Sequence, residues 1–455
     1  MDIPRRHVLG ASAAGIAGAL AIPAEAARTA PLTSALGRDA THYGVRPNAT
    51  GDQTRTLQRA IDEAARANAP LALPPGVYRT GPLQLSKGSQ LVGVRGATTL
   101  TFTGGASLLA AEGADHLGLS NLTFDGGGIP LPERRGLIHC LGGRDVRILD
   151  CAITGSGGNG IWLENIAGEI SGNLIEKIET TGIVSFDALG LTVARNTILQ
   201  TKDNGIEILR TAIGHDGSIV TGNRIENIKA GRGGSGQHGN AINAFRAGNV
   251  IISGNRISDC DYSAVRGNSA SNIQMTGNSI TAVREVALYS EFAFEGAVIA
   301  NNSVDGAAVG VSVCNFNEGG RLAVVQGNMI RNLLPKRPIG TAPDDDAGIG
   351  IYIEADTSVT GNLIENAPSF GIMAGWGKYL RDVAITGNVI RKTFIGIGVS
   401  VADGAGTALV NTNVISDAPR GAVVGLDHAK PMTPDLAADG ATKYVQIVIG
   451  ANAVR

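Results

Sequence analysis

The sequence predicts an all-β fold in which the chain winds into a parallel β-helix of about eleven or more turns. The first observation is a Gly-Asn-x-Ile phrase, seen as TGNRIENI at 221–228, whose variants return at intervals of 23 to 34 residues. The second is a short apolar phrase behind a small residue, as in NGIWLE at 159–164, after each return. The third is composition: glycine makes up 64 of 455 residues and aromatics 4%. Such periods indicate stacked repeats, and such composition indicates short strands between tight turns.

Residues 1–27 are expected to be an export signal. Arg5 and Arg6 precede a weakly apolar run over 8–22, and Ala24-Glu25-Ala26 offers small residues for cleavage. The run is too short and too rich in Ala and Gly for a stable membrane span. RRHVLG resembles the twin-arginine signal, which carries folded proteins across the bacterial inner membrane. We therefore expect the twin-arginine export machinery as a partner, no membrane span in the mature form, and a periplasmic or secreted location.

Residues 28–110 are predicted to form an N-terminal cap and the first turns of the β-helix. An amphipathic helix is expected from Thr54 to Ala67, and Pro74-Pro75-Gly76 marks a turn before the next strand. A helix over the first turn would cover a sheet edge that could otherwise pair with another chain. The apolar face of the predicted helix consists of Leu57, Ala60, Ile61 and Ala64.

Residues 111–426 are predicted to be the β-helix repeats. One turn reads as a strand (250–253), a Gly-Asn bend, a second strand (256–258), a variable loop, and a third strand behind a small residue (264–267). We expect the Asn to take left-handed backbone angles, with the Gly relieving the steric strain beside it. Because turns stack about 4.8 Å apart, equivalent amides can hydrogen-bond along the axis, and Asn carries both a donor and an acceptor. The predicted ladder consists of Asn173, Asn196, Asn223, Asn255, Asn278, Asn302, Asn328, Asn362, Asn388 and Asn413.

Residues 41–96 resemble the amino-terminal region of pectin-lyase-like β-helix proteins. Tyr43-Gly44, Gly51-Asp52 and the turn from Leu73 to Tyr78 match positions of that region. With the export signal and the repeated Gly-Asn phrases, the whole chain is similar to the twin-arginine-translocated repeat proteins of bacteria, a family with no assigned reaction. The resemblance implies a right-handed, single-stranded parallel β-helix and an exported protein, and it implies no chemistry. Residues 427–455 are expected to be the C-terminal cap, with a last strand at 444–449.

Charge and cysteine usage exclude several classes of function. The formal charge is -2, with 38 basic and 40 acidic residues, which gives no electrostatic case for nucleic acid or an anionic membrane as a partner. The four cysteines form no CxxC pair, so no zinc site is predicted. Cys140 and Cys151 could pair in an oxidising compartment, but buried thiols are favoured. No cofactor or metal is predicted, since the acidic run 344–346 is more typical of a solvated loop than of a cation site.

The candidate catalytic residues come from aligning the third strand of successive turns. The two longest intervals place loops 229–240 and 334–346 in the same slot, before that strand. The outward residues of the turns near these loops form a polar stripe, although outward positions are polar in any sheet. In β-elimination a Tyr or His base removes a proton next to a carboxylate, while Arg or Asn stabilises the developing charge. The residues of these types are Tyr289, Arg266, His238, Glu207, Asn243 and Glu291.

Three functions remain open from the sequence. The favoured one is an enzyme that acts on an acidic polysaccharide as a lyase, epimerase or hydrolase. Hydrolysis by Glu207 and Glu291 is disfavoured, because three turns separate them by about 14 Å and paired carboxylates need about 5–9.5 Å. The alternatives are a non-catalytic β-helix that binds glycan or envelope components, and a structural scaffold. A row of exposed aromatics would favour binding, and this row is thin: Trp162, Tyr289, Tyr352 and Trp376.

Overall fold

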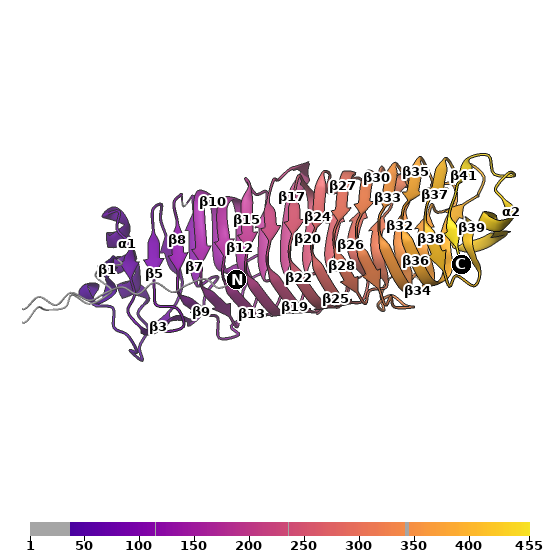
Figure 1. The fold of residues 1–455 in the computed structure, drawn as a ribbon. Helices are drawn as coiled ribbons and strands as arrows, with labels where there is room; N and C mark the ends of the chain where they lie inside the picture. The colour runs from indigo at the N-terminus through magenta and orange to yellow at the C-terminus, as the bar shows by residue number, and fades with distance from the viewer. Residues whose placement is uncertain (1–36, 114, 235, 342–344) are drawn as a thin grey trace, which may run out of the picture.

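The computed structural model describes residues 37–113, 115–234, 236–341 and 345–455. Over these ranges the chain winds into one elongated solenoid, whose first and last turns lie at opposite ends (Figure 1). The export signal predicted for residues 1–27 lies outside the described residues. No helix in the described ranges is long and apolar enough to cross a bilayer.

Three parallel sheets, here called A, B and C, run along the solenoid. Each turn passes from sheet B through the Gly-Asn bend to sheet C and then to sheet A, and equivalent strands of successive turns pair in parallel. Sheet A has fourteen strands, so the prediction of a parallel β-helix with eleven or more turns is confirmed. Strands β10, β12, β34 and β36 each bend and contribute to two sheets.

Sheet A carries the surface that concerns function. Its strands are β4 (Leu83–Leu85), β7 (Leu109–Glu112), β10 (Gly136–Leu149), β12 (Asn159–Ser171), β14 (Ile183–Phe186), β17 (Ile206–His215), β20 (Ile242–Gly248), β23 (Val265–Asn268), β26 (Val286–Glu291), β29 (Val309–Val313), β32 (Ile349–Ile353), β34 (Leu363–Ala374), β36 (Val389–Ser400) and β39 (Gly421–Asp427). An antiparallel strand, β40 (Lys430–Asp435), pairs with β39 beside the short helix α2 (Leu436–Asp439) at the C-terminal end.

Sheets B and C meet at the Gly-Asn bends. In addition to β10 and β12, sheet B contains β1 (Arg38–Asp39), β2 (Leu71–Ala72), β5 (Gln90–Val92), β8 (Gly118–Ser120), β15 (Leu191–Ala194), β18 (Ile219–Thr221), β21 (Ile251–Ser253), β24 (Ile273–Thr276), β27 (Glu295–Ala300), β30 (Arg321–Gln326), β33 (Thr357–Thr360), β35 (Val383–Thr386), β37 (Ala408–Asn411) and β41 (Ile447–Ile449). In addition to β34 and β36, sheet C contains β3 (Gly76–Thr80), β6 (Thr98–Phe102), β9 (Thr123–Asp125), β11 (Ala152–Thr154), β13 (Leu174–Ile178), β16 (Thr197–Thr201), β19 (Arg224–Ile228), β22 (Arg256–Cys260), β25 (Ser279–Val283), β28 (Ser303–Asp305), β31 (Met329–Arg331), β38 (Val414–Ser416) and β42 (Ala453–Val454).

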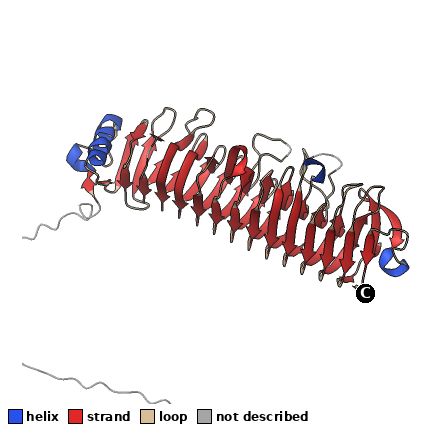
Figure 2. Cartoon of the chain, turned by 90° about the horizontal axis from the view of Figure 1, so that it is seen from above, coloured by secondary structure: helices blue, strands red, loops and turns tan. Residues whose placement is uncertain are grey.

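The predicted amphipathic helix is present as α1 (Thr54–Arg66) at the N-terminal end of the solenoid (Figure 2). It follows the short 3-10 helix η2 (Ala40–Tyr43) in the chain. Its four predicted apolar residues are all buried. Gln58 pairs with the backbone of the edge strand β4, because its Nε2 donates to Gln84 O at 2.9 Å and its Oε1 accepts from Gln84 N at 2.8 Å. The helix therefore occupies backbone groups that an open sheet edge would leave free for another chain.

The Gly-Asn bend differs from the prediction in one respect. The left-handed angle belongs to the glycine, with φ of +64° at Gly222 and +65° at Gly254, and not to the Asn that follows. Where glycine is replaced, the substituted residue takes the same conformation, with φ of +56° at Arg195 and +58° at Asn301. The expectation of left-handed Asn residues is therefore wrong, and the Asn is required for its amide.

The asparagine ladder is confirmed. Asn223 shows its pattern: both its backbone N and its Nδ2 donate to Asn255 Oδ1 at 3.0 Å, and Nδ2 also donates to Val193 O at 3.0 Å. The ladder ends at the N-terminal side on Cys151, whose backbone N donates to Asn173 Oδ1 at 2.9 Å. It extends one turn beyond the predicted set, to Asn452. Each rung thus satisfies polar groups that the core would otherwise bury without partners.

The interior of the solenoid is aliphatic, and Cys140, Cys151 and Cys260 pack in it, whereas Cys314 lies on the outer face of sheet A. Cys140, Cys151, Cys260 and Cys314 are all buried free thiols. Cys140 and Cys151 therefore do not form the disulfide that the sequence allowed. Stacked side chains of successive turns, such as Ile225, Ile257 and Ile280, supply the continuous core that holds the sheets together.

Candidate functional site

The outer face of sheet A carries the row of side chains predicted from the sequence. We call it the first outer row, and its neighbours in strand register are His139, Trp162, Val184, Glu207, Asn243, Arg266, Tyr289, Ser312, Tyr352 and Met373. The strand register confirms the predicted alignment of the outward residues, and Ser312 lies between Tyr289 and Tyr352 in this row. A second outer row lies two residues further along each strand and includes Asn268, Glu291, Cys314 and Glu354.

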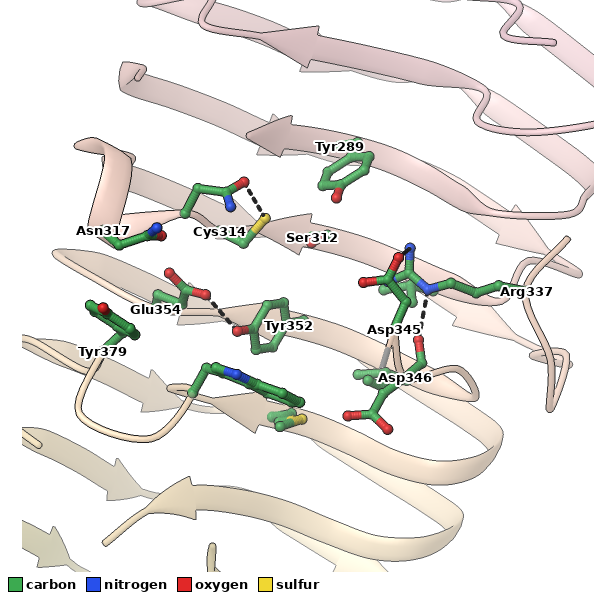
Figure 3. Close-up of a pocket in the computed structure, with 15 residues that line it drawn as sticks. Tyr289, Ser312, Cys314, Asn317, Arg337, Asp345, Asp346, Tyr352, Glu354 and Tyr379 are labelled. Atoms are coloured by element: carbon green, nitrogen blue, oxygen red, sulfur yellow. Dashed lines mark hydrogen bonds and ion pairs between the residues drawn. The ribbon is translucent and has the colours of Figure 1, made fainter. Parts of the chain in front are cut away.

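A cavity of about 400 Å³ opens over the C-terminal part of the first outer row (Figure 3). Its floor contains Tyr289, Ser312 and Tyr352 from three successive turns. Since the serine is small, the two tyrosine rings flank a gap that spans two turns, about 9.6 Å along the axis. The remaining lining residues are Val309, Cys314, Asn315, Asn317, Arg337, Asp345, Asp346, Ile349, Glu354, Met373, Trp376 and Tyr379.

Tyr352 and Glu354 form a buried pair at one end of the cavity. Tyr352 Oη donates to Glu354 Oε1 at 2.5 Å, and the backbone N of Phe316, in the short 3-10 helix η3 (Phe316–Glu318), donates to Glu354 Oε2 at 2.6 Å. Burial, and then the charge of Glu354, raises the pKa of Tyr352 well above its ordinary value. Burial also raises the pKa of Glu354. The pair can therefore hold or accept a proton at the edge of the cavity.

Aromatic rings from sheet A and from a separate loop line the cavity. Tyr289 and Tyr352 come from the sheet, while Trp376 and Tyr379 come from the loop that follows β34. The loop is tight, because Trp376 and Tyr379 exchange backbone hydrogen bonds of 3.2 and 3.0 Å. Three members of the thin aromatic row predicted from the sequence thus meet in one place. Trp162 lies far toward the N-terminus, where it packs against Phe186.

Arg337 brings a cation to the other end of the cavity (Figure 3). It lies on loop 334–346, and its Nε donates to Asp346 O at 2.8 Å. Its Nη1 lies 3.9 Å from Asp345 Oδ2 and 3.7 Å from Glu285 Oε1. Glu285 is buried and also accepts from Ser263 Oγ at 2.6 Å. The guanidinium is therefore held by one hydrogen bond and by two ion pairs that are each longer than 3.5 Å.

The structure divides the six predicted candidates between two places. Tyr289 lines the cavity, with the Arg266 guanidinium 5.3 Å from its ring centre. Arg266 and Glu291 lie beside the cavity, joined by a 2.6 Å bond from Nε to Oε1. Arg266 also donates to Gly236 O in loop 229–240, which covers it. Burial raises the pKa of Tyr289 well above its ordinary value, so at neutral pH it is a proton donor.

The other three candidates form a separate cluster under loop 229–240. Glu207 accepts from Asn204 Nδ2 at 2.7 Å, and Asn243 follows it in the first outer row. His238 is partly buried in the loop, and burial lowers its pKa. The ion pair between Arg232 and Asp203 holds the loop to the sheet. Asn243 and Glu207 lie two and three turns from Tyr289 of the cavity floor, and the catalytic roles of all three residues stay predictions.

Glu207 predicts a pH dependence of stability. Burial raises the pKa of its carboxyl from 4.5 to about 7 in the folded protein. The unfolded chain releases this proton at lower pH, so the stabilisation by protonated Glu207 is lost as pH rises through about 7. We expect Glu207→Gln to be more stable than the wild type at pH 8, by about 2 kcal/mol, and to match it near pH 5. Thermal unfolding at pH 5 to 8 checks this, and parallel curves for the two proteins would contradict it.

Sequence reasoning missed Arg337 and Glu354 as site residues. The sequence analysis names Tyr352 only as an exposed aromatic, and nothing in the repeat distinguishes Glu354 from other polar outward positions. One signal was available: β32 follows loop 334–346, which occupies the longest interval of the chain. Long loops beside a regular sheet are typical places for function. Within the described ranges, no group of three or more His, Cys, Asp or Glu side chains is arranged to hold a metal ion.

Comparisons with known proteins agree with this architecture. No curated protein matches the sequence. Solved structures that resemble the chain include pre-mature gene product 12 of bacteriophage phi29, at 15% identity over 86% of this chain and 63% of that chain, with a TM-score of 0.53. The mannuronan C-5 epimerase AlgE6 A-module of Azotobacter vinelandii is 14% identical over 92% and 99%, with a TM-score of 0.49. PfbA, a surface adhesin of Streptococcus pneumoniae, is 14% identical over 92% and 89%, with a TM-score of 0.43.

Likeness at these identities concerns the fold alone. The family assignment comes from the sequence, because residues 95–215 and 213–381 match the family described as the right handed beta helix region. These segments cover more than half of the chain and include the turns that form the cavity. The chain therefore belongs to the right-handed β-helix family.

Proposed function

We propose that the protein acts on an acidic polysaccharide in the cavity of sheet A, by removing a proton next to a carboxylate as a lyase or an epimerase. The observation that carries this proposal is the 2.5 Å hydrogen bond between Tyr352 Oη and Glu354 Oε1 in a cavity lined by aromatic rings. Tyr and Glu side chains are suitable proton-transfer groups. Apolar and aromatic walls with a few convergent polar groups are typical of ligand sites.

The abstraction of the substrate proton needs only this pair. As the C5–H bond of a uronate breaks, its proton passes to Tyr352 Oη while the phenolic proton passes to Glu354. In a lyase, the released electron pair forms the C4–C5 double bond, the C4–O4 bond breaks, and the pair returns a proton to O4. In an epimerase, C5 takes a proton on its opposite face from Tyr289, two turns away, and solvent returns the protons. Both routes balance without a further reactant.

Hydrolysis is less compatible with the carboxylates of the cavity. Asp345 and Asp346 precede β32 and Glu354 follows it. The strand spans about 13 Å at 3.3 Å per residue, which places the two groups at opposite ends of the cavity (Figure 3). Paired carboxylates act across about 5–9.5 Å. Glu291 is two turns from Glu354, but it is bound to Arg266 and Asn268 and does not line the cavity.

Arg337 supports an acidic substrate, because a guanidinium binds a carboxylate in a bidentate manner. Asp345 competes for this cation. We therefore expect Asp345→Asn to bind a uronate polymer more tightly than the wild type, by about two- to fivefold for an ion pair in which Asp345 is 44% exposed. Isothermal titration checks this, with a neutral polymer of equal length as the control. Equal affinities of the two proteins for the uronate polymer would argue against Arg337 as its ligand.

A second candidate function is glycan binding without turnover, which the four aromatic rings of the cavity favour. One set of assays separates the two. The purified protein is incubated with uronate polymers. Unsaturated ends are followed by absorbance at 235 nm, deuterium uptake at C5 is followed by NMR, and reducing ends are measured by a chemical assay. Absorbance at 235 nm indicates a lyase, and deuterium uptake without cleavage indicates an epimerase. Binding without either indicates the second candidate, and reducing ends without absorbance would overturn the proposed reaction.

A further inference from the structure

The outer face of sheet C changes character along the solenoid. After Leu174, its outward row is polar over five turns and then becomes apolar at β31, where four successive turns carry an exposed Met, Leu or Val. The polar part of the row consists of Thr197, Arg224, Arg256, Ser279 and Ser303. The apolar part, here called the apolar row, consists of Met329, Leu363, Val389 and Val414, whose exposed fractions are 39, 42, 37 and 42%.

A charged row runs beside the apolar row, two residues further along the same strands. Its members alternate in sign from one turn to the next: Asp305, Arg331, Glu365 and Arg391. Within the chain, Arg331 pairs with Asp305 and Arg391 pairs with Glu365, each at 2.8 Å. All four side chains keep between 28 and 50% of their surface exposed. They can therefore meet a second set of charges without leaving their own partners.

We propose that the apolar and charged rows form the interface of an antiparallel dimer of this chain. When two copies meet face to face with their long axes opposed, the apolar row lies over the apolar row and the charged row lies over the charged row. The order of the turns is reversed between the copies. Leu363 then faces Val389 of the other copy, Met329 faces Val414, and Glu365 faces Arg391. Two sheets packed in this way lie about 10 Å apart.

The charges select this arrangement over a parallel one. With the long axes parallel, the strands of the two copies run in opposite directions, so the charged rows lie on opposite sides of the contact when the apolar rows meet. The other two parallel alignments place the apolar row over the charged row, or each charge over a like charge. Both outcomes are unfavourable, because like charges repel and an apolar partner leaves a charge unpaired. The antiparallel order places Glu365 opposite Arg391 of the other copy while the apolar rows stay in contact, and Arg331 then faces the neutral Ser416. A closed two-fold interface of this kind uses the same surface on both copies and does not propagate into fibres.

The size of the interface predicts a modest affinity. The apolar row covers four turns, or about 14 Å between its ends, which is smaller than the surface of a standard permanent complex. We expect a dissociation constant of about 10–100 μM. Sedimentation equilibrium from about 1 to 300 μM spans this range. Dimers at the upper concentrations are the expected result, and a monomer throughout would overturn the proposal.

Two variants test the surface. Leu363→Glu places a charge against Val389 of the other copy and is expected to abolish the dimer. Ile219→Glu is the matched control, since Ile219 is 38% exposed on the outer face of sheet B, and it is expected to dimerise like the wild type. Circular dichroism and the melting temperature establish that both variants fold. Equal association of the two variants would show that the dimer, if present, uses another surface.

Cysteine cross-linking tests the direction of the two chains. Met329→Cys and Val414→Cys are prepared separately and mixed under mild oxidation, while the four natural cysteines are buried. The antiparallel arrangement predicts a disulfide in the mixture and none in Met329→Cys alone, whose two thiols would lie about 14 Å apart along the axis. A covalent dimer of Met329→Cys alone would indicate parallel chains. This outcome is independent of any activity at sheet A.

Discussion

Tyr352→Phe is expected to lower kcat on a uronate polymer by about 10²- to 10⁴-fold, which is the usual contribution of a positioned acid or base. The phenyl ring keeps the wall of the cavity, and only the hydroxyl that bonds to Glu354 at 2.5 Å is removed. Substrate binding should change little, because the aromatic face remains. The expected result is therefore a loss in kcat with a nearly constant KM, measured at 235 nm or by deuterium uptake at C5.

Tyr379→Phe is the matched control for this variant. Tyr379 lines the same cavity and is also replaced by a ring of the same shape, but no carboxylate is bonded to its hydroxyl in the structure as described. Its kcat should stay within about twofold of the wild type, as is usual when no transition-state interaction is removed. If Tyr352→Phe keeps the wild-type rate, the proton passes through another group. Glu207, Asn243 and His238 would then be the next residues to replace.

Asn278→Leu is expected to destabilise the fold by about 3–5 kcal/mol, because it leaves several buried donors without acceptors. Asn278 Oδ1 accepts from Asn255 N and Asn255 Nδ2, both at 3.0 Å. Its own N and Nδ2 donate to Asn302 Oδ1 at 2.9 and 3.0 Å. Leucine has nearly the same volume, so the loss would come from the hydrogen bonds and not from a cavity.

The effect should depend on the place of the Asn in the ladder. Asn452→Leu is the control, since Asn452 ends the ladder and is only partly buried, so that water can satisfy the groups it leaves. We expect a loss of about 1 kcal/mol or less there. Thermal unfolding gives the overall change, and hydrogen exchange locates it, because solenoids lose stability locally and between neighbouring repeats. Equal losses at both positions would mean that burial of the amides contributes little.

The candidate site shows how far a repeat can be followed from sequence. The alignment placed Glu207, Asn243, Arg266 and Tyr289 on neighbouring outer positions, and the strand registers agree. This was possible because a turn of the β-helix repeats the same geometry, and the period of the phrase measures it. The chemistry of each position was less predictable. Outward positions of a sheet tolerate polar residues whether or not they have a role.

Loops decided which outer residues share a cavity. Arg337 reaches Glu285 and the cavity because the described segment 334–341 packs near sheet A, where Ile339 O accepts from Tyr262 Oη. Loop 229–240 covers Arg266 and separates it from open solvent. Neither loop has a repeating pattern, so its course depends on contacts between residues far apart in the chain. Tyr262 is one such contact, since its hydroxyl lies 2.8 Å from Gly234 O and 3.1 Å from Ile339 O.

The sequence by itself determined the solenoid, its ladder of Asn residues and the alignment of its outer rows, because these features follow from a local pattern that each turn repeats. The tertiary structure decided the rest. It showed that glycine and not Asn bends the corner at Gly222, that the four thiols stay free, and that Tyr352 and Glu354 meet beside aromatic rings from a separate loop. The physical reason is that burial and proton affinity at a site depend on which irregular segments pack over a regular sheet.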